Sequence, residues 1–151
     1  MKKLILLILT LSLICLASCS AEKELPAPSD LFSAIESEIG SLSMIDLADE
    51  MLEGDTGISP DQYSSAVYCL SMAGNSPEEI IIIAAIDAEN AKDIEAKLNA
   101  RFENKAEAVK KYLTEHQTVV NSTVVRRDGL TVSLICSYKV DEIIKVYESI
   151  K

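Results

Sequence analysis

The sequence lacks most of what metal-binding, catalytic and nucleic-acid-binding proteins need. Its 151 residues include one histidine and no tryptophan, and 14 basic side chains face 24 acidic ones, for a formal charge of -10. A single histidine excludes a multi-histidine metal site. The acidic balance excludes the basic surface that binds nucleic acid. The length suits one domain and leaves no room for a large two-domain enzyme.

Catalytic signatures are equally scarce. The sequence has no Gly-rich phosphate loop, no zinc-ligand pattern and no paired-carboxylate motif. A Ser or Cys nucleophile would need a partner base, and His116 is the one histidine. His116 lies where a long helix is expected to end, where an imidazole is well placed to cap free carbonyls. We therefore expect a protein that is not an enzyme, with no catalytic residues, no metal and no cofactor.

Five carboxylates gather before Gly57 and could in principle bind a divalent ion. The regular Asp/Asn alternation of a calcium-binding loop is absent. A solvated helix face is the better interpretation of this cluster, which consists of Asp46, Asp49, Glu50, Glu53 and Asp55.

The N-terminus has the pattern of an export signal. Lys2 and Lys3 precede an apolar run of 13 residues, from Leu4 to Leu16, whereas a membrane-spanning helix needs about 20. Such a run behind lysines is typical of a secretory signal peptide. The next residues, Leu16-Ala17-Ser18-Cys19, resemble a bacterial lipobox, in which the Cys becomes the acylated N-terminus. The alternative is an ordinary signal peptide that happens to contain a Cys.

The lipobox pattern predicts how the chain is divided and where it is held. Residues 1–18 are expected to be removed after Leu16, Ala17 and Ser18, leaving lipid on Cys19. Two or three acyl chains anchor a protein stably, so we expect it on the outer face of the cell membrane. Residues 19–30 contain Pro26 and Pro28 and are interpreted as a flexible tether. Residues 31–151 are then the single folded domain.

Helical patterns occur at three places in this domain. Leu31, Ile35 and Ile39 recur at four-residue spacing before Gly40, whereas Met44–Leu52 reads as short helical or irregular. Apolar positions three, four or seven apart predict a long amphipathic helix from about 88 to 115. A final helix is predicted over 141–149.

Four strands are predicted between these helices. Strand composition marks 63–70, and the continuous run at 79–86, with four isoleucines, is typical of a buried central strand. Asp128-Gly129 indicates a hairpin between strands at 119–126 and 130–138, with Val132, Leu134, Cys136 and Tyr138 facing the core. The order ββαββα, preceded by one or more N-terminal helices, predicts an α+β domain. We expect a four-stranded, antiparallel-rich sheet with helices packed on one face.

Two further cysteines fall in these predicted strands. In an exported domain Cys69 and Cys136 could form a disulfide, if both faced the same side of the sheet. Otherwise they are buried free thiols. A reactive redox pair has less support, because the sequence has no Cys-x-x-Cys.

Arg126 and Arg127 form an adjacent basic pair beside the predicted hairpin turn. Such a pair is most often solvated. If a protein or an anionic glycan docks on this domain, these arginines are the modest candidate for the interaction surface.

From Pro77 onward the chain has a distinctive series of features. They are an apolar strand opened by Glu78-Glu79-Ile80, a helix that begins at Asp87-Ala88-Glu89-Asn90-Ala91 and carries Leu98-Asn99-Ala100-Arg101, the stretch Glu115-His116-Gln117, Val124-Val125, and the turn Asp128-Gly129. This pattern resembles a family of bacterial lipoproteins named domain of unknown function 4358. The resemblance covers about residues 45–151 and includes the lipobox. It implies a lipid-anchored α+β domain and brings no activity or functional residues.

These observations lead to three functional hypotheses. The first is a non-enzymatic domain that binds or scaffolds an envelope protein with a neutral or basic surface. The second is a small-ligand sensor or carrier, which requires a pocket between the sheet and its helices. The third is an envelope hydrolase, or a redox protein that uses Cys69 or Cys136.

Overall fold

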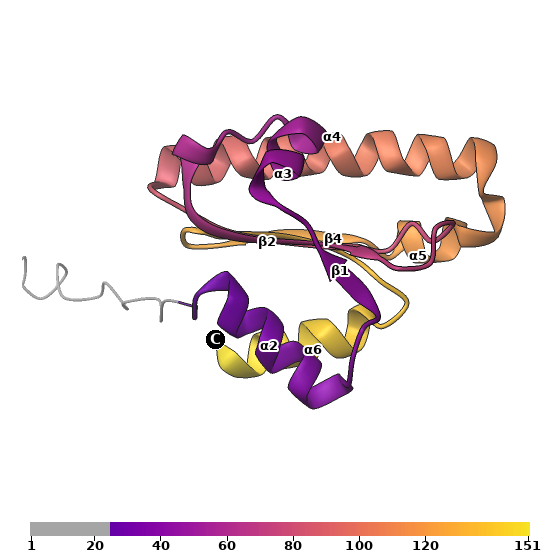
Figure 1. Ribbon diagram of the computed structural model, residues 1–151, viewed down its shortest axis with the longest axis horizontal. Coiled ribbons are helices and arrows are strands. Elements are labelled where there is room, and N and C mark those ends of the chain that lie inside the picture. The colour runs from indigo at the N-terminus through magenta and orange to yellow at the C-terminus, as the bar shows by residue number, and fades with distance from the viewer. Residues whose placement is uncertain (1–24) are drawn as a thin grey trace, which may run out of the picture.

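A five-stranded antiparallel sheet lies at the centre of the chain in the computed structural model, which describes residues 25–151 (Figure 1). The strand order is β1-β2-β3-β5-β4, so β3 is the middle strand. The sequence correctly predicted the α+β class and the antiparallel pairing. The strands are β1 (Met44–Asp46), β2 (Tyr63–Ser71), β3 (Glu79–Ala85), β4 (Val124–Asp128) and β5 (Thr131–Cys136).

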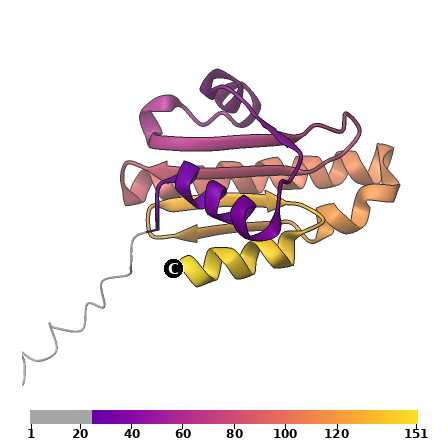
Figure 2. The same cartoon turned by 60° about the horizontal axis from the view of Figure 1, so that its bottom comes forward.

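Helices cover both faces of this sheet rather than one. On one face lies the long helix α4 (Ala88–Tyr112), together with α3 (Asp49–Thr56) and α5 (Gln117–Asn121). On the other lie α2 (Pro28–Ile39) and α6 (Val140–Ile150), which contact each other (Figure 1). Figure 2 shows α2 and α6 side by side on the same face of the sheet. Two short 3-10 turns also occur: η1 (Pro60–Gln62) lies before β2, and η2 (Thr114–His116) lies between α4 and α5.

The isoleucine run in β3 shows why two helical layers are needed. Ile81 and Ile83 belong to the core on the α4 face, whereas Ile80 and Ile82 belong to the core on the α2/α6 face. Successive strand side chains point to opposite faces. A strand that is apolar at every position must therefore be covered on both sides, which is what the prediction of one helical face missed.

Three local predictions also need correction. Met44–Asp46 forms a fifth strand, because it pairs with residues 69–71 of β2. The predicted strand at 119–126 begins only at Val124, and Val119 lies in α5. Tyr138 does not face the core: β5 ends at Cys136, the alternation stops there, and the Tyr138 side chain is exposed.

The folded chain begins earlier than the predicted tether would allow. α2 starts at Pro28, inside the segment 19–30. Proline is well suited to the first turn of a helix, because its missing N–H would have no helical partner there and its φ is already helical. Leu31 and Ile35 then enter the α2/α6 core as fully buried side chains.

Candidate functional site

An open cleft of about 700 Å³ lies between the C-terminal half of α4 and the loop that joins β2 to β3. We call it the α4 cleft. Its apolar walls come from Ala108, Val109 and Tyr112 on α4 and from Ala73 and Pro77 on the loop. Charged side chains line the same cleft: Asp55, Glu78, Arg101 and Lys105. The cleft therefore combines apolar walls with charges of both signs.

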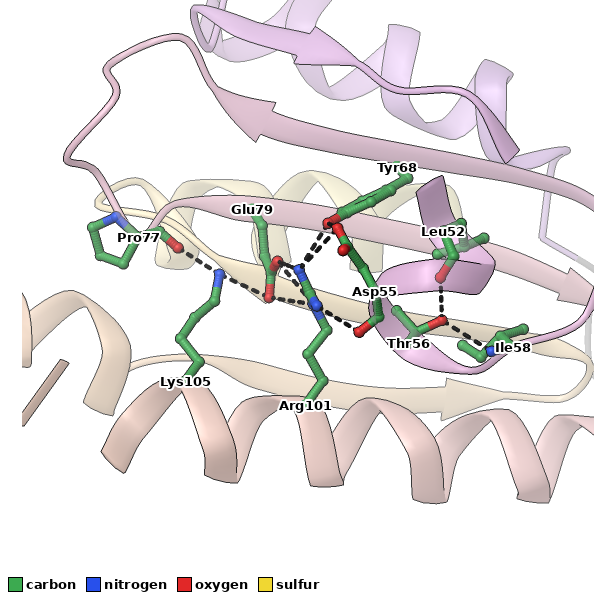
Figure 3. Close-up of polar contacts among 9 residues, drawn as sticks. All are labelled: Leu52, Asp55, Thr56, Ile58, Tyr68, Pro77, Glu79, Arg101 and Lys105. Atoms are coloured by element: carbon green, nitrogen blue, oxygen red, sulfur yellow. Dashed lines mark hydrogen bonds and ion pairs between the residues drawn. The ribbon is translucent and has the colours of Figure 1, made fainter. Parts of the chain in front are cut away.

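A completely buried carboxylate lies beside the cleft and organises its charges. Glu79, the first residue of β3, is 0% exposed. Arg101 donates to it from Nε at 3.0 Å and from Nη2 at 2.8 Å, and Lys105 Nζ lies 2.9 Å from it (Figure 3). A buried carboxylate is tolerated only when it is paired and hydrogen-bonded. Arg101 and Lys105 are four residues apart, so both lie on one face of α4.

A tyrosine and a second carboxylate extend this cluster. Arg101 Nη2 donates to the Tyr68 hydroxyl at 2.7 Å, and the hydroxyl donates to Asp55 Oδ2 at 2.6 Å. Arg101 Nη1 donates to the backbone carbonyl of Asp55 at 2.9 Å. The guanidinium also lies 5.5 Å from the centre of the Tyr68 ring. Arg101 thus joins α4 to β2, β3 and α3.

The end of α3 holds Asp55 in this position. Gly57 is left-handed, with φ 69°, and its N–H donates to the carbonyl of Glu53. The Thr56 hydroxyl donates to the carbonyl of Leu52 at 2.6 Å and accepts from the N–H of Ile58 at 3.1 Å (Figure 3). A glycine at the C-terminal cap is the usual way to reverse the chain after a helix. These contacts fix the last turn of α3 beside Arg101.

The protonation of the cluster follows from its surroundings. Burial lowers the pKa of Arg101, but the charge and hydrogen bonds of Glu79 outweigh this effect and leave that pKa raised. Burial raises the pKa of Tyr68, and its hydrogen bond to Asp55 raises it further. At neutral pH the guanidinium is charged and the tyrosine keeps its proton, so Tyr68 can donate to Asp55.

The turn that follows β5 and the turn η2 are linked to the cleft through hydrogen bonds that begin at Glu78. Glu78 accepts from the Ser137 hydroxyl at 2.9 Å and from the N–H of Tyr138 at 3.0 Å. The Tyr138 hydroxyl lies 2.6 Å from Nδ1 of His116. Met72 and Tyr112 are each 70% exposed. Of these two side chains, Tyr112 lines the cleft.

The two strand cysteines do not meet. Cys69 on β2 and Cys136 on β5 are free and buried, and β3 lies between their strands. Cys136 belongs to the core on the α4 face, whereas Cys69 follows Tyr68, a member of that core, and so points to the opposite face. A bridge between them would have to pass through the sheet. Burial is the largest cause that raises the pKa of Cys69 to about 12 and the pKa of Cys136 above its usual value.

The two adjacent arginines are engaged within the domain. Arg126 Nε donates to Asp128 at 2.6 Å, and its guanidinium lies 4.5 Å from the centre of the Tyr147 ring. Arg127 Nε lies 2.7 Å from Glu95 of α4. Both are on β4 rather than at a free hairpin tip, and neither lines the α4 cleft.

Other predicted features lie elsewhere or outside the described residues. His116 is in η2, beyond the end of α4, and contacts Tyr138 instead of capping the helix. Within residues 25–151 no three His, Cys, Asp or Glu side chains form a group that could hold a metal ion. No helix in that range is long and apolar enough to span a bilayer. The signal peptide and the cleavage and lipidation residues Leu16, Ala17, Ser18 and Cys19 lie outside the described residues.

Sequence reasoning did not find the charged cluster. Its signals were a glutamate directly before the isoleucine run and two basic residues at i and i+4 on the apolar-striped helix. Neither signal shows that Glu79 is buried, or that Tyr68 and Asp55 join it. Those relations depend on how β2, β3, α3 and α4 come together.

One comparison with known proteins identifies a family for the chain. Residues 37–137 match the family described as "Domain of unknown function (DUF4358)". No curated protein and no solved structure matches the chain. The match covers more than half of the chain, so the protein belongs to the DUF4358 family.

Proposed function

We propose that this member of the DUF4358 family is a non-enzymatic binding domain, held at the outer face of the cell membrane by lipid on Cys19. The observation that carries the binding role is the α4 cleft, which is open, measures about 700 Å³ and combines apolar walls with charged groups. Ligand pockets typically have a volume of about 300–1,000 Å³ and a few polar groups that orient the ligand. Among the three hypotheses, the cleft favours the small-ligand sensor or carrier.

The chemistry of the described residues supports binding rather than catalysis. His116 lies outside the lining of the cleft and contacts Tyr138. The raised pKa of each strand thiol keeps it protonated, and a protonated thiol is a poor nucleophile and redox centre. In the cluster, Glu79 is held by two cations and Tyr68 by Asp55 and Arg101. Side chains that ion pairs and hydrogen bonds hold in fixed positions can orient a ligand.

A protein partner is the second candidate. Tyr112 lines the cleft and is exposed, Met72 is exposed directly after β2, and the exposed Tyr138 donates its N–H to the cleft residue Glu78. Exposed apolar side chains that lie together mark interaction sites more often than isolated ones do. This candidate would make the cleft part of a larger interface for an envelope protein.

A ligand screen with a blocked cleft tests the binding role. We expect small amphipathic molecules to give saturation-transfer NMR signals with the full-length protein, and Ala108→Trp to remove these signals by filling the cleft. Ala100→Trp is the matched control, because Ala100 is also exposed on α4 but does not line the cleft. Signals that survive Ala108→Trp, or their absence from the unsubstituted protein, would contradict the proposal.

The intact mass of the protein extracted from membranes tests the anchor. A mass that fits an acylated chain from Cys19 to Lys151 supports it, and Cys19→Ser should yield an unacylated protein that leaves the membrane fraction. An uncleaved, unmodified chain would refute it. The pattern of residues 16–19 is what supports the anchor and hence the location.

A further inference from the structure

Two cations that line the α4 cleft share one completely buried carboxylate. Glu79 faces two cations, Arg101 and Lys105, at 2.8 and 2.9 Å. A single buried carboxylate balances only one of them. The balance for the second positive charge has to come from the other two carboxylates of the lining, Asp55 and Glu78, or from a bound anion. In a partly buried place the attraction between opposite charges is stronger than at the open surface.

Asp55 meets this need only in part. Its Oδ2 lies 3.9 Å from Nη2 of Arg101, beyond hydrogen-bond distance, and the side chain is 42% exposed. Its hydrogen bond is made with the hydroxyl of Tyr68 instead. Asp55 is thus a weak, solvent-exposed counter-ion that a better-placed carboxylate could replace.

Two hydrogen-bond donors at this place are still free to bind a ligand. Of the five N–H groups of Arg101, four are used by Glu79, Tyr68 and the carbonyl of Asp55, which leaves one on Nη1. Of the three on Lys105, two are used by Glu79 and the carbonyl of Pro77. These counts cover the contacts made within residues 25–151. Two donors on adjacent cations suit the two oxygens of one carboxylate.

The other carboxylate of the lining does not oppose this arrangement directly. Glu78 is occupied by three donors, the hydroxyls of Ser76 and Ser137 and the N–H of Tyr138. It faces the turn that follows β5. The apolar walls, formed by Pro77, Ala108, Val109 and Tyr112, offer a surface for an apolar group next to the cations.

Resting on the proposed function of the cleft, we propose that its ligand is a small amphipathic carboxylate. The carboxylate binds beside Arg101 and Lys105 in exchange for the weak contact of Asp55. The apolar part of the ligand lies against the walls of α4 and the β2–β3 loop. Asp55 then acts as an internal competitor that lowers the affinity.

A matched pair of probes tests the need for the carboxylate. N-acetylphenylalanine and its carboxamide differ only in the charged group, and both are titrated into the full-length protein by NMR. We expect the acid to bind about tenfold more tightly, in line with one charge-assisted contact pair. Octanoate, titrated in parallel, distinguishes a fatty acid from a peptide end as the source of the same chemistry.

A variant tests the exchange with Asp55. Asp55→Asn keeps an acceptor for Tyr68 and removes the competing charge, so we expect about threefold tighter binding of the acid and no change for the amide. Asp141→Asn, an exposed site on α6 with the same change in net charge, should alter neither. Thermal melts of all variants control for folding.

The outcomes separate this inference from the function on which it rests. Equal affinities for acid and amide, both abolished by Ala108→Trp, would overturn the carboxylate preference and keep the binding cleft. Weaker or unchanged acid binding by Asp55→Asn would refute the exchange. If acid, amide and octanoate all fail to bind, both this inference and the proposed function lose their support.

Discussion

The two faces of the sheet use the same middle strand in different ways. On the α2/α6 face, β3 contributes Ile80 and Ile82 to an apolar layer that also contains the fully buried Leu31, Ile35 and Tyr147. On the α4 face the same strand contributes Ile81 and Ile83, but it begins with the buried charge of Glu79. One face is thus a core that holds the domain together. The other adds a charged cluster and a cleft at one end.

The residues that match the family include the elements of the α4 face and leave out most of the α2/α6 layer. Residues 37–137 include all five strands and α3, α4 and α5, but they exclude α6 and most of α2. The region shared with the family therefore contains the cleft and its charges. The helices of the second layer lie mostly outside it.

The largest loss in the free energy of unfolding is expected from replacing Arg101. Arg101→Met leaves Glu79 buried with one fewer cation, and breaking a buried pair costs about 3–5 kcal/mol. Urea unfolding of the purified protein measures this loss. Replacing both partners, as in Glu79→Leu with Arg101→Met, should restore part of it, since the buried carboxylate is gone and Lys105 loses Glu79 but keeps its hydrogen bond to the carbonyl of Pro77.

The control for this prediction is another arginine in an ion pair. Arg127 pairs with Glu95, and both side chains are about one-third exposed. Arg127→Met should therefore lower the free energy of unfolding by less than about 1 kcal/mol. Equal losses for the two substitutions would mean that the burial of Glu79 contributes little.

A smaller effect is expected on the opposite face. Ile35→Ala opens a cavity in the α2/α6 core and should lower the free energy of unfolding by about 2–4 kcal/mol. Binding in the α4 cleft should stay unchanged, because the sheet separates the two sites. Ser33→Ala, at an exposed position of α2, should change neither property. A loss of cleft binding in Ile35→Ala would show that the two faces are coupled.

The smallest effect on folding stability is expected from protonation of Asp128, in the β4–β5 hairpin, at low pH. Burial raises the pKa of Asp128, but its hydrogen bonds with Arg126 and Lys151 outweigh burial and leave that pKa below its ordinary value of 3.8. The charged carboxylate therefore stabilises the folded protein above about pH 4. This contribution is lost as the pH falls through the lowered pKa.

Asp128→Asn should therefore flatten the fall in thermal stability below pH 4. Scanning calorimetry between pH 6 and pH 2 measures this slope. Glu142→Gln, which removes an exposed carboxylate of α6, serves as the control. A slope as steep in Asp128→Asn as in the unsubstituted protein would rule out this contribution.

Local patterns predicted most elements, and the failures have physical causes. The isoleucine run, the striped helix and the Asp128-Gly129 turn gave β3, α4 and the β4–β5 hairpin. Val119 and Val120 have strand propensity, but they lie in α5, buried in the α4-face core. Tertiary packing overrode local preference there. Likewise, three-residue β1 has too short a pattern to detect and exists because it pairs with β2.

The charged cluster could not be predicted for a different reason. The sequence pattern predicts a solvated acidic face for Asp55 and the start of a strand for Glu79. Their roles arise from contacts over 13 to 46 positions in the sequence: Asp55 with Tyr68, Glu79 with Arg101, and Asp55 with Arg101. No local period encodes such contacts, because they are set by the crossing of α4 over the sheet.

The most direct test of the division between a binding face and a packing face is a map of ligand-induced shifts. N-acetylphenylalanine is titrated into ¹⁵N-labelled full-length protein, and backbone amide shifts are followed. We predict changes in the β2–β3 loop, at 72–78, and in the second half of α4, at 101–112, with α2 and α6 unaffected. Changes centred on α2 and α6 would contradict the account.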